Sequence, residues 1–172
     1  MTFLLDKKIH IKVFISKILA ILLVSILGNF IIKGRSSLWA KSPLTESLGT
    51  IQSKALNGDS HYQGALALFH KFGERGLAID LQEAERWAKL ASEKEGAIGL
   101  CTLAALSLES GKINRGHFLY DEAYLHSNLL ALAKGKDPLA MFCLGMIEID
   151  NPPRNFTKAI RHLEASAEKG FA

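Results

Sequence analysis

The chain has 172 residues, of which 48% are hydrophobic and 8% aromatic, a composition typical of a folded globular protein and not of a disordered one. Residues 1–40 hold six of the 21 Lys and Arg residues and one of the 17 acidic residues, which leaves 15 basic and 16 acidic residues in 41–172. This nearly neutral remainder argues against nucleic-acid binding through bulk charge. Two cysteines, Cys101 and Cys143, are too few for a disulfide-rich miniprotein or a cysteine-rich zinc domain.

The N-terminal segment predicts a single hydrophobic helix. Residues 18–32 carry no charge, and residues 13–32 are interrupted only by Lys17, which supplies the roughly 20 residues that a bilayer-spanning helix needs. The basic residues 1–17 favour a cytoplasmic N-terminus, so we expect a signal-anchor helix at 18–32 with the rest of the chain on the non-cytoplasmic side. The alternative is cleavage near Ala40, which would leave a secreted or periplasmic protein. Residues 33–56 then read as a linker.

The remainder of the chain, residues 57–172, contains an internal repeat. Glycines recur at 58, 96, 135 and 170, with spacings of 38, 39 and 35 residues. A leucine followed by a small residue recurs in the same register, as does an alanine that follows a charged residue: Leu66-Ala67, Leu103-Ala104 and Leu144-Gly145, then Ala84, Ala123 and Ala159. These markers divide the segment into three repeats, at about 59–96, 97–135 and 136–170.

Each repeat is predicted to form two helices joined by a turn. In the third repeat, Asp137 before Pro138 is typical of a helix start, and the proline pair after Asn151 should end that helix. Asn155 then caps a second helix that runs to Lys169, where Gly170 supplies a left-handed position. In the second repeat we expect a longer turn, over 111–116. Helix pairs of this size bury their apolar faces by stacking, so the predicted fold is an all-α solenoid of helical hairpins.

At this point the sequence resembles the Sel1-like repeat family, which is related to the tetratricopeptide repeats. The resemblance covers about residues 58–172 and rests on these residues: Ala140, Leu144-Gly145, Lys158-Ala159 and Ser166–Gly170 in the third repeat, and Gly76-Leu77, Asp80, Ala84, Trp87 and Ala91–Glu93 in the first. The second repeat matches weakly because no Asp stands at the cap position. The resemblance implies a binding scaffold, often in an exported or envelope protein.

Motifs for catalysis or cofactor binding do not occur in the sequence, including the metalloprotease, nucleophile-elbow, dinucleotide and phosphate-loop signatures. The acidic pairs Glu83/Glu85 and Asp121/Glu122 fall in the first turns of predicted helices, where negative charge suits the helix dipole. We therefore expect no catalytic, cofactor or metal site. We expect Cys101 and Cys143 to be buried and to remain free thiols. The leading hypothesis is a non-catalytic protein–protein interaction scaffold. The alternatives are a protein that binds or hydrolyses an envelope polymer and a truncated family member without a function of its own.

The family resemblance also suggests which residues would contact a partner protein or peptide. In the tetratricopeptide architecture the concave face is built from positions that flank the leucine–small pair of each first helix. Transferred by offset, these positions are Gly64, Leu68, Lys71, Phe72, Cys101, Ala105, Leu108, Leu139, Phe142, Met146 and Ile149. The predicted partner-binding residues among them are Leu68, Lys71, Phe72, Leu108, Phe142, Met146 and Ile149. The last three share one helical face, while Leu144 faces the opposite way toward the second helix. Either superhelical stacking buries this face, or it forms an apolar strip for an amphipathic helix.

The C-terminal edge of the solenoid is the last predicted feature. Ile160, Leu163 and Ala167 follow one another at helical spacing, and Phe171 lies beyond them. We expect this stripe to remain partly uncovered unless Phe171 folds back across it. An apolar edge of this kind would favour self-association.

Overall fold

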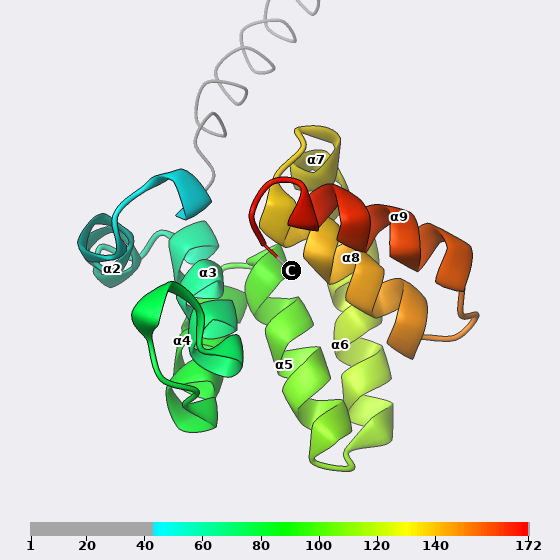
Figure 1. Cartoon of the computed structure of the whole chain (residues 1–172). Helices are drawn as coiled ribbons and strands as arrows, with labels where there is room; N and C mark the ends of the chain where they lie inside the picture. Colours follow the sequence, from blue (N-terminus) through cyan, green and yellow to red (C-terminus); the bar gives the residue numbers. More distant parts are fainter. Residues whose placement is uncertain (1–42, 172) are drawn as a thin grey trace, which may run out of the picture. The chain divides into compact units, whose positions relative to one another are not determined.

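The computed structural model describes residues 43–171 (Figure 1). The predicted segments 1–17 and 18–32 lie outside these residues, as does the first part of the predicted linker. None of the helices within 43–171 has both the length and the apolar composition that crossing a bilayer requires.

Eight α-helices and two short 3-10 helices form the described part of the chain. In order they are η1 Pro43–Thr45, α2 Leu48–Leu56, α3 Ser60–Phe72, η2 Glu74–Gly76, α4 Leu81–Ser92, α5 Ala97–Glu109, α6 Ile113–His126, α7 Leu129–Lys134, α8 Pro138–Asp150 and α9 Phe156–Ala167. Three antiparallel pairs, α3/α4, α5/α6 and α8/α9, stack one after another (Figure 1). The predicted all-α architecture of consecutive helical hairpins is confirmed.

The helix starts follow the capping residues that the sequence indicated. Asp80 Oδ1 accepts hydrogen bonds from the backbone N–H groups of Gln82 and Glu83, each at 3.0 Å, at the start of α4. The Asp137 side chain caps α8, in which Pro138 is the first residue, and the Asn155 side chain caps α9. Each cap satisfies backbone donors that have no partner inside the helix. The α9 helix ends at Ala167, two residues before the predicted end.

Small residues lie where helices cross, both within a pair and between neighbouring pairs. A methyl group on Gly145 of α8 would lie 2.6 Å from Leu163 Cδ2 of α9, and one on Gly99 of α5 would lie 2.4 Å from the Cβ of Ala91 on α4. Ala84, Ala123 and Ala159, the repeated alanines of the second helices, are buried. Close approach of the helix backbones therefore explains this part of the repeat pattern.

Part of the segment that the sequence assigned to a linker is folded. Residues 48–56 form α2, which packs against α3 and buries Ile51 and Ala55 completely. The Tyr62 hydroxyl and the Lys54 ammonium both reach Glu46 Oε1, at 2.9 and 2.7 Å, and burial raises the pKa of Tyr62. The Ser, Gly and Lys residues of the segment, together with Pro43, suggested a linker, although a Ser47 cap precedes the helix and Leu48, Ile51, Ala55 and Leu56 lie within it.

The second repeat differs from its neighbours in the length of its turn. Residues 110–112 alone join α5 to α6, and Gly116 lies inside α6, so the longer turn predicted over 111–116 is not formed. In the first repeat, residues 73–80 separate the two helices. The α6 helix ends at His126, and residues 129–134 form the additional helix α7, which buries Leu129 and Leu132.

Candidate interaction surface

The first helices of the three pairs form the surface on which the predicted partner-binding residues lie. α3 packs against α5, and α5 packs against α8, so these helices occupy neighbouring positions (Figure 1). All seven predicted residues fall on them: Leu68, Lys71 and Phe72 on α3, Leu108 on α5, and Phe142, Met146 and Ile149 on α8. Their surroundings nevertheless differ greatly.

Three of the seven residues are engaged inside the protein. Leu68 has no exposed surface and belongs to the hydrophobic core, so it offers nothing to a partner. The Lys71 side chain is almost fully buried, with an ion pair to Glu109 of α5. Leu108 packs against the core and lies beside Gly116 of α6. At these three positions, the offset from the leucine–small pair therefore failed to predict an accessible side chain.

Phe72 and Phe142 meet directly in a cluster of four aromatic rings. Their ring centroids lie 5.4 Å apart in an edge-to-face arrangement, which brings α3 and α8 together. Phe171 fills the space beside them, with its ring centroid 4.9 Å from that of Phe142 and 6.2 Å from that of Phe69. Edge-to-face pairs of this kind are favourable beyond the burial of their area. We call Phe69, Phe72, Phe142 and Phe171 the aromatic cluster.

The end of the described chain is held in place by this cluster. Only 2% of the Phe171 surface is exposed, and the Ser166 hydroxyl lies 2.7 Å from the carbonyl oxygens of both Phe171 and Pro138. Phe171 therefore folds back onto Phe69 of α3 and Phe142 of α8, whereas the sequence suggested only a fold across the α9 stripe. On α9, by contrast, Phe156 and Ile160 remain more than half exposed. The uncovered part of the C-terminal edge is thus the outer side of α9.

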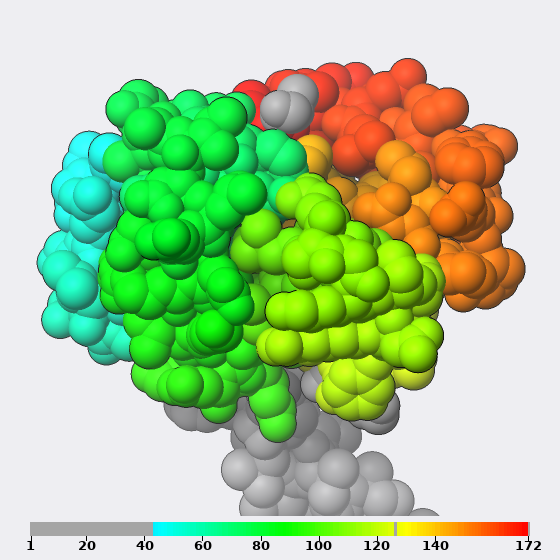
Figure 2. Space-filling view, turned by 90° about the horizontal axis from the view of Figure 1, so that it is seen from below, coloured from blue at the N-terminus to red at the C-terminus, as the bar shows by residue number. Residues whose placement is uncertain are grey.

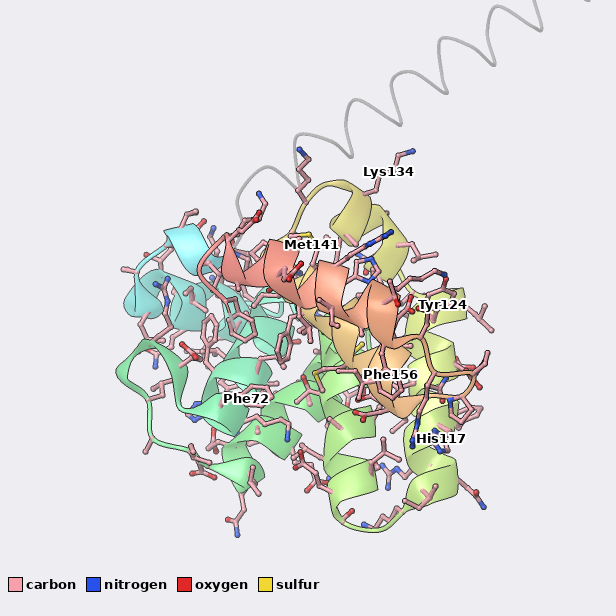
Figure 3. All side chains as sticks on the ribbon, turned by 45° about the vertical axis from the view of Figure 1, so that its right-hand side comes forward. Phe72, His117, Tyr124, Lys134, Met141 and Phe156 are labelled. Atoms are coloured by element: carbon pink, nitrogen blue, oxygen red, sulfur yellow. The ribbon has the colours of Figure 1, made fainter. Side chains whose placement is uncertain are left out.

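Phe72, Phe142, Met146 and Ile149 keep part of their surface accessible. Phe72 is 39% exposed, and Figure 3 shows it on α3. The other three lie at i, i+4 and i+7 on α8 and are half-buried. Since Phe72 contacts Phe142, the four side chains form one continuous apolar surface from α3 to α8. We call it the concave strip, after the tetratricopeptide face from which its positions were transferred. Phe171 packs against Phe142 of the strip, and Phe69 packs against Phe171. Helical spacing alone did not identify these contacts.

The two cysteines lie at the interface of α5 and α8, buried and free as expected. Burial, reinforced by the neighbouring Cys101 thiol, raises the pKa of Cys143 well above its usual value. The Tyr120 hydroxyl of α6 donates to Asp150 Oδ2 at 3.2 Å, and burial raises the pKa of this phenol strongly as well. The Cys143 thiol and the Tyr120 phenol therefore stay neutral near pH 7, which suits a structural role and not an acid–base role. Within residues 43–171, no three side chains of the metal-binding types gather into a ligand set.

The comparisons with known proteins add no identification. No protein-family model matches the sequence, and no curated protein matches it. The structure shows stacked antiparallel helix pairs, and this general architecture is the part of the family resemblance that it confirms.

Proposed function

We propose that this chain is a non-catalytic protein–protein interaction scaffold of the Sel1-like repeat type. Residues 18–32 would tether it to a membrane, with the repeats on the non-cytoplasmic side, unless cleavage near Ala40 releases them. The observation that supports this proposal is the concave strip, a continuous apolar surface of Phe72, Phe142, Met146 and Ile149 contributed by the first and third helix pairs.

The strip has the chemistry of a surface for an amphipathic helix. Its α8 residues repeat at helical spacing and present apolar side chains in a row, as helix-binding grooves do. Met146 adds a flexible, polarisable side chain that adapts to different partners. Unlike the fully buried Leu68, these residues keep part of their surface accessible, while Phe142 and Met146 also pack against the core.

Site-specific photo-crosslinking in the native cell tests the proposal. A photoreactive amino acid at Ile149 should capture a partner protein, whereas the same amino acid at Leu130 should not, because Leu130 lies on α7 outside the strip. Leu130 is a stringent control, since it is apolar and more exposed than the half-buried Ile149. Met146→Glu should keep the helical content and abolish the crosslink from position 149. Leu130→Glu is the matched control and should leave that crosslink unchanged.

Two outcomes would contradict the proposal. If Met146→Glu unfolds the helix pairs, the residue belongs to the core and the strip is not a binding surface. If positions 149 and 130 capture the same proteins in equal amounts, contact at the strip is non-specific. The proposed membrane tether is tested separately by carbonate extraction, in which the intact chain should stay with the membranes.

A further inference from the structure

The additional helix α7 changes the junction between the second and third helix pairs. Residues 93–96 connect α4 to α5, and α4 packs along α5 over its length. The connection from α6 to α8 instead takes residues 127–137, and α6 meets α8 at only a few positions. The α7 helix packs mainly against α8, α6 and α8 meet at few positions, and a space is left between α6 and the third pair.

This space is a groove of about 310 Å³ between α6, the end of α8 and the start of α9. We call it the junction groove. It is lined by Asp121, Tyr124 and Leu125 of α6, Ile147 and Glu148 of α8, and Asn151, Pro152, Pro153, Asn155 and Lys158 of the turn and α9. In Figure 2 the surface is indented between the lime-coloured α6 and the orange segment of α8 and α9. Tyr124, one of the lining residues, is labelled in Figure 3.

The walls of the junction groove are fixed by hydrogen bonds between its two sides. Asn151 Oδ1 accepts from His117 Nδ1 at 2.9 Å, and Asn151 Nδ2 donates to Asp121 Oδ1 at 2.8 Å. The backbone N–H of Asn155 donates to the Glu148 carbonyl oxygen at 2.8 Å. The turn after α8 is therefore tied to both α6 and α8, and the groove is formed before any partner binds, which lowers the entropic cost of binding.

Apolar side chains accessible to solvent supply the hydrophobic part of the groove. Leu125 lies near the end of α6, in the middle one of the three helix pairs, and is nevertheless 65% exposed. Tyr124 beside it is 37% exposed. Pro152 and Pro153 face the same space from the turn. Exposed leucine, tyrosine and proline around a hollow suit insertion of one bulky apolar side chain.

Charge decides what kind of partner would fit. Asp121 and Glu148 both line the groove, and among the side chains that the structure describes neither carboxylate takes part in an ion pair. Lys158 is the only cation among the lining residues. A bound segment with lysine or arginine next to its apolar side chain would meet complementary charge, whereas acidic segments and anionic lipid would be repelled.

We propose that the junction groove binds a segment of a partner protein in which a bulky apolar side chain is flanked by lysine or arginine. This surface lies on α6 and the α8–α9 turn, apart from the concave strip. Loss of function at one surface therefore does not imply loss at the other.

Fluorescence anisotropy with three labelled hexapeptides tests this inference on the full chain in non-ionic detergent. Lys-Lys-Leu-Phe-Lys-Lys should bind, while Glu-Glu-Leu-Phe-Glu-Glu and Lys-Lys-Ser-Gly-Lys-Lys should bind at least tenfold more weakly. Leu125→Ser should weaken binding of the first peptide at least fivefold without loss of helicity, because the leucine is largely exposed. Asp121→Asn combined with Glu148→Gln should do the same and should also flatten the salt dependence of binding.

Matched controls separate the groove from the general surface. Leu130→Ser removes an exposed leucine on α7, and Glu164→Gln combined with Glu168→Gln removes two exposed carboxylates in and just after α9. Both should change the affinity less than twofold. Equal binding of the acidic peptide, or equal losses in the groove and control variants, would overturn the inference. A concave-strip variant, Met146→Glu, should leave peptide binding unchanged, so the two proposals fail independently.

Discussion

Replacing Phe171 by alanine tests whether the end of the chain is part of the fold. The side chain is 2% exposed and contacts Phe142 and Phe69. Full burial of a phenylalanine is worth roughly 2 to 3 kcal/mol, and each ring contact adds roughly 0.5 to 1 kcal/mol. Freeing the backbone of a terminal residue returns about 1 to 2 kcal/mol. We therefore expect Phe171→Ala to lower the free energy of unfolding by about 2 to 3 kcal/mol.

Thermal and urea unfolding of the full chain, followed by circular dichroism in non-ionic detergent, measures this loss. For a folded part of this size, 1 kcal/mol corresponds to a Tm change of about 4 °C, so the Tm should fall by about 10 °C. Phe156→Ala is the matched control, since that phenylalanine is 59% exposed, and its free energy of unfolding should change by less than about 0.5 kcal/mol. If Phe171→Ala behaves like Phe156→Ala, the docked position of Phe171 is refuted.

Four further outcomes are expected. Gly99→Ala should destabilise the fold by about 1 to 3 kcal/mol in urea unfolding, because the new methyl group would lie 2.4 Å from the Cβ of a facing alanine. The control Gly49→Ala has nothing within 4 Å and should not destabilise it. The thiols of both cysteines, being fully buried with the pKa of Cys143 raised, should resist a thiol reagent at pH 8 and react completely in urea; rapid reaction of the folded protein would contradict their burial. A hydrogen bond from Arg86 lowers the pKa of Glu83. The small stabilising effect of this bond should be present above the unfolded pKa of about 4.3 and be lost as the pH falls through the lowered folded value. Arg86→Ala should abolish this part of the acid dependence. Ile160→Asp should weaken self-association in analytical ultracentrifugation, because Ile160 is 55% exposed on the outer side of α9; an unchanged association constant would exclude that surface.

The sequence by itself determined where three of the helices, α4, α8 and α9, begin. Asp80, Asp137 and Asn155 act on backbone groups two or three residues away, so their effect is visible in the local sequence. The recurring small residues likewise reported the helix crossings, because only a small side chain fits where two helices touch, as Gly145 shows against α9. These local and pairwise constraints were enough to predict an all-α stack of hairpins.

The tertiary structure alone decided which of the predicted surface residues are accessible. Whether Leu68 faces the core or a partner depends on how far the stack turns between the first and third pairs, and no local interaction encodes that turn. The contact of Phe72 with Phe142 joins residues from two separate helix pairs. The α7 helix lies between the second and third pairs, and the spacing of the recurring glycines did not predict it. Local chemistry thus fixes the helices, whereas long-range packing fixes the surface between them and with it the candidate sites.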